Sequence, residues 1–179
     1  MSRLTFALLP CLLTLAIAPG LQAQVSKDLS DPEVAHVTVT ANSIDIDLAK
    51  FAQPHLGSES VRKFAVTMVT DHSAVNEQAA ALATKLGVTP KDNPVSQSLL
   101  KGATGAKASL EKIRGAAFDR AYMDREVAYH QAVLDALDGL LIPTTSNAEL
   151  KKLLVEVRPA IAAHLAHAKK HQSSLVAAK

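Results

Sequence analysis

The sequence predicts an all-α protein, built as a bundle of four long helices. Apolar residues recur every three or four positions through four long segments, which is the period of an amphipathic helix. No neighbouring segments alternate with the two-residue period of a strand pair. The sequence also contains no glycine-rich phosphate loop and only one cysteine. These patterns favour helices packed on helices around one core.

The first 23 residues are interpreted as a secretory signal peptide. A basic residue is followed by an apolar run of roughly 15 residues over positions 4–18, and Ala23 is the expected cleavage residue. The run contains Pro10 and is shorter than the about 20 residues that cross a bilayer; an uncleaved anchor is the alternative. Cys11 lies inside the run, so cleavage would leave a mature chain without disulfides. We therefore expect an exported protein.

Charge and composition exclude several classes of partner. The formal net charge is +2, with both signs scattered along the chain, so no basic surface for nucleic acid is expected. Tryptophan is absent and aromatic residues make up 3%, which disfavours a surface that stacks on sugars or bases. No later segment has the length and apolarity of a transmembrane span. Small ligands, metal ions and envelope proteins remain as partners.

The domain is expected to cover residues 32–176, after a flexible leader over residues 24–31. Its first helix begins with Asp31 as the N-cap and Pro32 at the first helical position, which is a favoured place for proline. The helix is expected to end within residues 54–57, where a proline and a glycine occur.

The second helix has strong signals at both ends, and the segment after it has few. Ser58 is a favoured N-cap and Gly87 a favoured C-terminal stop, so the helix spans residues 59–86. Over residues 88–115, prolines and glycines interrupt the apolar pattern. We expect a long irregular crossover there, with one or two short helices.

The third and fourth helices complete the bundle. A strong amphipathic pattern covers residues 118–141 and stops at Pro143. Ser146 and Glu149 have the spacing of a capping box that starts the fourth helix, and Pro159 inside that helix is expected to kink it. Two helix pairs joined by a long middle connection are the ferritin-like arrangement of a four-helix bundle.

Three histidines, His72, His130 and His164, lie on the apolar stripes of three different helices. A buried polar ring without a partner costs about 1–3 kcal/mol, so each ring needs a hydrogen-bond acceptor or a metal. Imidazole binds Zn, Cu, Fe or Ni, and carboxylates complete such sites. Asp45 lies one residue from the stripe of the first helix and is expected to be half buried. These four residues are the candidate ligands of one transition-metal ion.

Two further carboxylates lie beside the candidate ligands. Asp71 precedes His72, and neighbouring residues on a helix point about 100° apart, so Asp71 is expected to flank the site or to contact another helix. Glu126 precedes His130 by one helical turn and shares its face. Both carboxylates are expected to support the ligands from outside the metal.

The same residues allow two other interpretations. In the first, the histidines bond only to one another and to the carboxylates, and the bundle is a structural or stress-associated envelope module without metal. In the second, a metal supports redox or hydrolytic chemistry, which needs an open coordination position. Di-iron bundles use a glutamate three residues before each histidine. The residues at those positions are Val69, Val127 and Ile161, so we expect no di-iron centre, and an enzyme is the least favoured interpretation.

Four segments of the chain resemble a known bacterial family. They are residues 44–50 (IDIDLAK), 61–72 (VRKFAVTMVTDH), 118–123 (FDRAYM) with His130, and 158–165 (RPAIAAHL). Their order is similar to that in the family called domain of unknown function 4142, and the resemblance covers about residues 33–175. It implies a ferritin-like bundle that is exported to the periplasm or associated with the outer membrane, a label the family often carries. It implies no particular activity.

Overall fold

The structure of the protein is a computed structural model that describes residues 29–177, so the expected signal peptide over residues 1–23 lies outside the described residues. The described chain consists of helices and the loops that connect them, and it contains no strand. Its elements are α1 (Asp31–Ala52), η1 (Gln53–His55), α2 (Glu59–Leu86), α3 (Pro94–Leu110), α4 (Ala116–Ala136), η2 (Leu137–Leu141), α5 (Ile142–Thr144) and α6 (Ala148–Ala177). Within these limits, no helix combines the length and the apolarity that membrane crossing requires.

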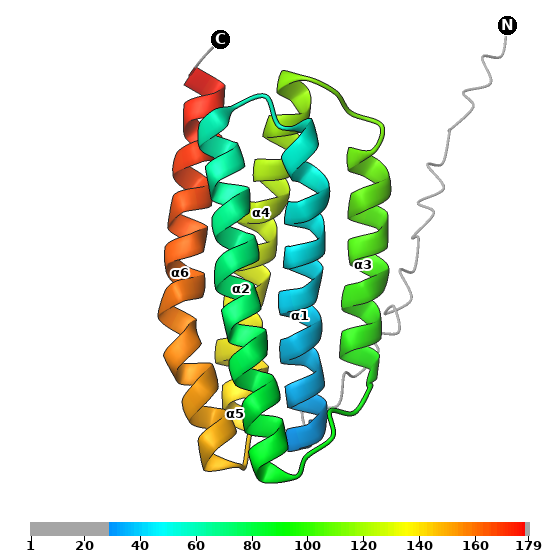
Figure 1. The fold of residues 1–179 in the computed structure, drawn as a ribbon, viewed down its shortest axis with the longest axis vertical. Helices are drawn as coiled ribbons and strands as arrows, with labels where there is room; N and C mark the ends of the chain where they lie inside the picture. Colours follow the sequence, from blue (N-terminus) through cyan, green and yellow to red (C-terminus); the bar gives the residue numbers. More distant parts are fainter. Residues whose placement is uncertain (1–28, 178–179) are drawn as a thin grey trace, which may run out of the picture.

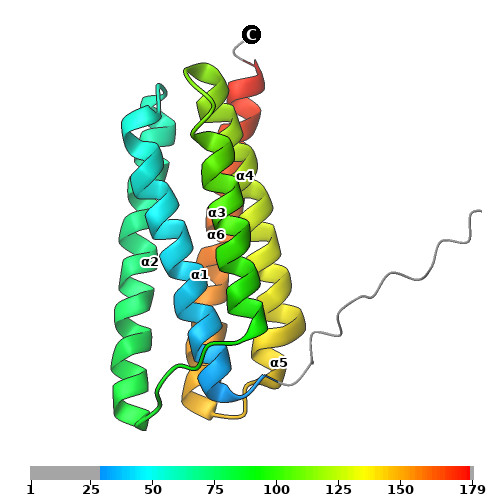
Figure 2. The ribbon, with the colours of Figure 1, turned by 90° about the vertical axis from the view of Figure 1, so that its right-hand side faces the viewer.

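The long helices run side by side as two antiparallel pairs (Figure 1). One pair is α1 with α2, the other is α4 with α6, and α2 also contacts α6. The fifth helix, α3, lies outside this group and contacts α1 and α4 (Figure 2). The structure therefore confirms the predicted all-α helical bundle.

The start of α1 differs from the prediction by one residue. Ser30 is the N-cap, and the Glu33 carboxylate accepts hydrogen bonds from its backbone N–H (3.0 Å) and its hydroxyl (2.7 Å). Asp31, the predicted N-cap, is instead the first helical residue. Its carboxylate accepts hydrogen bonds from the backbone N–H groups of Ser146 (2.8 Å) and Asn147 (3.0 Å). Asp31 thus joins the start of α1 to the start of α6.

The start of α6 also differs from the prediction by one residue. The Oδ1 atom of Asn147 accepts hydrogen bonds from the backbone N–H groups of Glu149 and Leu150, both at 3.0 Å. Asn147 therefore caps the helix, and the predicted capping box between Ser146 and Glu149 is wrong. Pro159 lies inside α6, which continues to its end at Ala177.

The limits of α2 are those predicted. Ser58 has an extended backbone, and its hydroxyl accepts a hydrogen bond from the backbone N–H of Val61. Gly87 ends the helix in the left-handed conformation with φ of 63°, which glycine adopts without a steric penalty. Its N–H donates to the last carbonyl groups of α2.

The crossover between α2 and α4 contains a regular helix of 17 residues, so the expectation of an irregular connection is wrong over α3. Asn93 caps this helix by accepting hydrogen bonds from the backbone N–H groups of Val95 (3.0 Å) and Ser96 (3.1 Å). Gly102 and Gly105 lie inside α3, where each costs about 1 kcal/mol relative to alanine. Pro94 begins the helix rather than breaking it, because its missing N–H would be unpaired at that position anyway.

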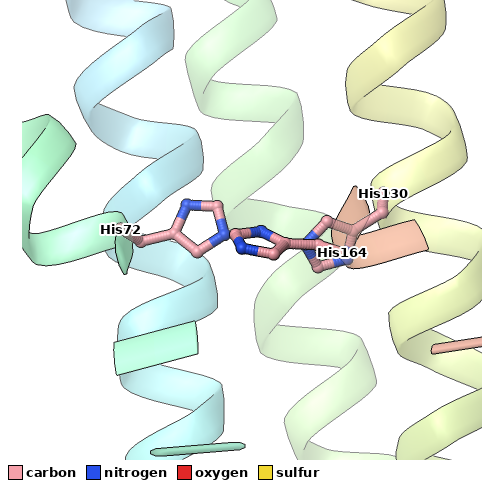
Figure 3. A group of neighbouring side chains, drawn as sticks. All are labelled: His72, His130 and His164. Carbon is pink, nitrogen blue, oxygen red and sulfur yellow. The ribbon is translucent and has the colours of Figure 1, made fainter. Parts of the chain in front are cut away.

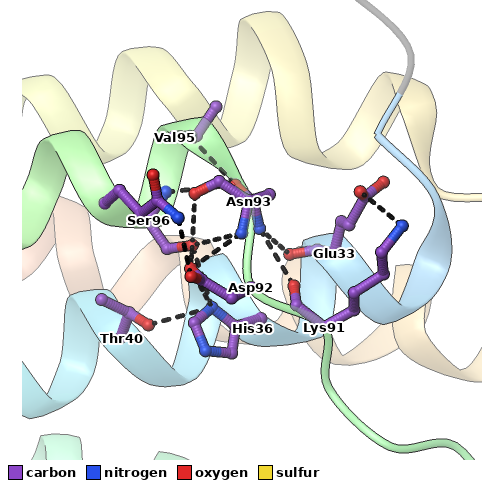
Figure 4. Close-up of polar contacts among 9 residues, drawn as sticks. Glu33, His36, Thr40, Lys91, Asp92, Asn93, Val95 and Ser96 are labelled. Atoms are coloured by element: carbon purple, nitrogen blue, oxygen red, sulfur yellow. Dashed lines mark hydrogen bonds and ion pairs between the residues drawn. The ribbon is translucent and has the colours of Figure 1, made fainter.

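The loop before α3 is bonded to the first turns of α1 (Figure 4). The Nδ2 atom of Asn93 donates to the backbone carbonyl of Glu33 at 3.2 Å. One turn further along, the Ser96 hydroxyl lies 2.9 Å from Nδ1 of His36. These tertiary bonds join the start of α3 to α1.

The third predicted helix is divided into three pieces. A regular α-helix ends at Ala136, one turn of π-helix follows as η2, and α5 carries Pro143. A π turn holds more residues than an α turn and displaces the side chains that follow it. Leu137 and Leu141, at the two ends of η2, are both buried.

Two apolar clusters fill the bundle, one toward each end. The first includes Phe64, Met68, Phe118, Tyr122 and Met123. The second includes Val34, Leu137, Leu141, Leu154 and Ile161. Five buried polar side chains lie between the two clusters and form what we call the polar layer: Asp45, His72, Glu126, His130 and His164.

Asp119 holds the turn between α1 and α2 from the first turn of α4. Its carboxylate accepts hydrogen bonds from the backbone N–H groups of Gly57 (2.9 Å) and Ser58 (2.7 Å), and the residue is buried. We expect Asp119→Ala to lower the free energy of unfolding in urea by about 2–3 kcal/mol, because both N–H groups lose a charged acceptor. Asp124→Ala removes an exposed aspartate from the same helix and is the control. Equal losses of unfolding free energy in Asp119→Ala and Asp124→Ala would contradict the role of Asp119 at this turn.

Candidate functional site

The polar layer draws its side chains from all four long helices of the two pairs. Asp45 belongs to α1, His72 to α2, Glu126 and His130 to α4, and His164 to α6. Helical spacing explains the burial of the rings, since His72 follows Met68 by one turn on the same face of α2. Asp45, predicted to be half buried, is 0% exposed. The four candidate ligands therefore lie in one layer of the core.

The three imidazole rings face one another at the centre of the layer (Figure 3). The ring centroids are 5.7 Å apart for His72 and His130, 5.3 Å for His72 and His164, and 5.5 Å for His130 and His164. One nitrogen from each ring lies within 4.8 Å of the other two. A tetrahedral zinc ion holds its nitrogen ligands about 3.3 Å apart, so a small inward movement of the rings would complete such a site.

Two of the rings donate their outer N–H to an acceptor that cannot itself donate. His130 Nδ1 lies 3.0 Å from the backbone carbonyl of Glu126, and His164 Nε2 lies 3.0 Å from Oδ2 of Asp71. These nitrogens therefore carry the protons. The inner nitrogens, Nε2 of His130 and Nδ1 of His164, carry the lone pairs. Asp71 contacts another helix, as predicted for a flanking residue.

His72 lies between an amide and the buried carboxylate. Its Nδ1 atom lies 2.7 Å from Oδ1 of Asn42, which fixes the ring, and its Nε2 atom lies 3.0 Å from Oδ2 of Asp45. The same carboxylate oxygen lies 3.6 Å from Nε2 of His130. Asp45 thus presents one oxygen to two of the three histidines.

Four buried atoms around the three rings have no hydrogen bond of good geometry among the described residues, although two of them, Nε2 of His72 and Oδ2 of Asp45, lie 3.0 Å apart as an ion pair. The four atoms are Nε2 of His72, Nε2 of His130, Nδ1 of His164 and Oδ2 of Asp45. Buried polar atoms in native proteins are almost always hydrogen-bonded, so a group of atoms that are not needs an explanation. Three imidazole nitrogens and a carboxylate oxygen are a donor set for a transition-metal ion, and outer N–H groups bonded to acceptors orient such ligands. The side chains present therefore fit one metal ion.

Arg125 is a site residue that the sequence pattern did not reveal. Its Nη1 atom lies 2.9 Å from Oδ1 of Asp45 and 2.8 Å from Oε1 of Glu126, and its guanidinium lies 3.9 Å from the centroid of the Tyr129 ring. Asn42 was also missed, although it precedes Asp45 by three residues and so shares its face of α1.

Burial is the main influence on ionisation in the layer. It lowers the pKa of His130 to about 4 and also lowers the pKa of His164, so both rings are neutral at pH 7 and keep their lone pairs. Burial, reinforced by the charge of Asp45, raises the pKa of Glu126 well above its ordinary value. Burial alone would also raise the pKa of Asp45, but the neighbouring basic side chains outweigh it and hold that pKa below its ordinary value.

The sequence was compared with protein families, curated proteins and solved structures. The family model described as "Domain of unknown function (DUF4142)" matches residues 16–170, a span that contains the whole polar layer. The chain belongs to the DUF4142 family. No curated protein and no solved structure matches it. The chemistry of this DUF4142 protein is therefore inferred from its own residues.

A cavity of about 230 Å³ lies against the histidines of the DUF4142 bundle. His72 and His164 are among its lining residues, and most of the remaining lining is apolar. Leu137 and Leu141 of the π turn and Ile161 of α6 contribute to that apolar lining. Irregular turns of this kind occur often at functional sites. The cavity gives one side of the histidine cluster room for a small molecule.

Proposed function

We propose that this DUF4142 protein binds one transition-metal ion in its core, through His72, His130, His164 and Asp45. The observation that supports this function is the convergence at one point of three imidazole nitrogens and a carboxylate oxygen, all buried and without a hydrogen bond of good geometry. A bound ion would give each of them a partner. Asn42 and the other outer acceptors would then hold the rings in place.

The donor set restricts the metal. Imidazole nitrogens suit Zn, Cu, Fe or Ni, whereas Mg²⁺ and Ca²⁺ prefer sites made wholly of oxygen atoms. Four protein ligands satisfy a tetrahedral ion, and the cavity beside His72 and His164 leaves space for an additional small ligand. We therefore infer a resident ion of the zinc or copper type, with iron as a further choice.

The cellular setting is part of the same proposal. The apolar N-terminal run supports export by a signal peptide over residues 1–23, to the periplasm or the outer membrane. Two antiparallel helix pairs joined by a long crossover support a ferritin-like arrangement.

A purely structural role in the envelope is the second candidate function. The observation in its favour is Arg125, which already compensates the charge of Asp45 without any metal. In that case the protein would keep its stability when metals are removed. It would also show no saturable metal uptake.

Metal titration decides between the two functions. We expect metal-stripped protein to take up one Zn²⁺ or Cu²⁺ ion per chain in equilibrium dialysis. A thousandfold excess over Kd would then raise the free energy of unfolding by about 4 kcal/mol. His72→Ala should weaken binding by more than the roughly 10–100-fold that loss of an outer partner causes, because it removes a ligand. His167→Ala, an exposed histidine of α6, is the control. Uptake unchanged by His72→Ala would rule out the metal site.

A further inference from the structure

The polar layer contains a second group of ligand atoms that overlaps the histidine cluster. Asp45, Glu126 and His130 each offer one atom within 4.8 Å of the other two, and all three residues are buried. Asp45 belongs to both groups. His130 has no free lone pair for a second ion, because its Nε2 atom faces the histidine cluster and its Nδ1 atom carries a proton. Oε2 of Glu126 has no hydrogen-bond partner among the described residues. This second group therefore has the composition of a cation site of its own.

The guanidinium of Arg125 already lies at this second group as its cation. Nη1 of Arg125 lies 2.9 Å from Oδ1 of Asp45 and 2.8 Å from Oε1 of Glu126. The two oxygens of Asp45 therefore face different neighbours. Oδ1 faces the guanidinium, and Oδ2 faces the histidines. The Asp45 carboxylate therefore lies between the guanidinium and the histidine cluster.

The charges explain why a cation is needed there. Asp45 and Glu126 are both 0% exposed, and a buried carboxyl group either needs a compensating cation or stays protonated. The guanidinium of Arg125 stays protonated over the whole range in which proteins fold. It therefore supplies the charge that a second metal ion would otherwise supply.

Arg125 also stands between the polar layer and the surface. Its side chain is 13% exposed and lines a groove of about 580 Å³ between α3 and α4. Small residues of α3, including Gly102 and Ala103, form the opposite wall. A shorter or uncharged side chain at position 125 would leave this groove as a path from solvent to the two carboxylates.

We propose that Arg125 fills a second cation position formed by the carboxylates of Asp45 and Glu126, and so limits the polar layer to one metal ion. The inference rests on the proposed metal binding at the three histidines. It adds that the same layer holds two cation positions, one taken by metal and one taken by arginine. Arg125 is a specificity-determining residue in this sense, because it sets how many ions bind.

Arg125→Met is the test, since methionine is uncharged and cannot compensate the carboxylates. We expect the variant to bind two Co²⁺ or Zn²⁺ ions per chain in equilibrium dialysis with elemental analysis, against one in the unchanged protein. With Co²⁺, magnetic coupling between the ions should alter the electron paramagnetic resonance spectrum, because Asp45 would bridge them. Arg125→Lys keeps the charge and should bind one ion. A single ion bound by both Arg125→Met and the unchanged protein would overturn the inference.

The outcomes separate this inference from the proposed function. One ion in both proteins overturns only the second position, whereas no ion in the unchanged protein and one in Arg125→Met overturns only the histidine site. No ion in either protein overturns both. If Arg125→Met does not fold alone, it is refolded with excess Zn²⁺: recovery with two ions supports the second position, and failure to recover overturns it. The Arg125→Met/Glu126→Gln double variant removes a ligand of the second position and should return to one ion.

Discussion

Asp45→Ala is expected to lower the free energy of unfolding of the metal-free protein by about 3–5 kcal/mol, which is the usual effect of removing one partner of a buried ion pair. Among the described residues, the substitution leaves the guanidinium of Arg125 paired with the carboxyl group of Glu126 alone. It also leaves His72 Nε2 facing a small void in place of a carboxylate oxygen. The same variant should lose metal binding, since the carboxylate ligand is gone. Urea denaturation and a Zn²⁺ titration measure the two effects.

Asp47→Ala is the matched control for Asp45→Ala. Asp47 lies two residues later in α1 and is exposed, so its removal should change stability by less than about 0.5 kcal/mol. Asp45→Asn keeps the size of the side chain and removes only its charge, which separates electrostatics from packing. If Asp45→Ala were as stable as Asp47→Ala, the ion pairs of Asp45 would not stabilise the polar layer.

Phe118→Ala is expected to lower the free energy of unfolding by about 3–5 kcal/mol, the range for phenylalanine truncated in a packed core. Phe118 is 1% exposed and its ring lies 6.2 Å from that of Phe51 and 5.3 Å from that of His55, measured between centroids. It belongs to the first apolar cluster and not to the polar layer. We therefore expect metal affinity to stay close to that of the unchanged protein.

Phe51→Ala provides the comparison for Phe118→Ala. Phe51 contacts the same cluster but is only partly buried, so the loss of stability should be smaller. Together with Asp45→Ala, these variants separate the effect of a substitution on stability from its effect on metal affinity. Loss of metal affinity in Phe118→Ala, measured where the variant is fully folded, would contradict the division of the core into cluster and layer.

The sequence predicted a helix end correctly where only one residue in the segment is a favoured cap. Ser58 and Gly87 delimit α2 as expected, because neither has a strong competitor beside it. The starts of α1 and α6 were each displaced by one residue, since two good capping residues stand next to each other there. A tertiary contact decides between them: Asp31 binds the start of α6 and so leaves the cap of α1 to Ser30.

The candidate site was partly visible in the sequence for a similar reason. Helical spacing places His72, His130 and His164 in the core, because the period of a helix is regular. Helical spacing alone predicted that Asp45 is only half buried. Its full burial depends on Arg125, which lies 80 residues away in the chain. A pairing between α1 and α4 leaves no periodic trace, so it could be found only in three dimensions.

The position of the polar layer between two apolar clusters also sets the register of the bundle. Apolar stripes alone would allow neighbouring helices to slide past one another by a turn, about 5.4 Å, and still bury leucine against leucine. Such a shift would bring an imidazole or a carboxylate into an apolar cluster with no partner, at about 1–3 kcal/mol for each unpaired group. Because α1, α2, α4 and α6 all contribute to the layer, it fixes the alignment of all four helices at once.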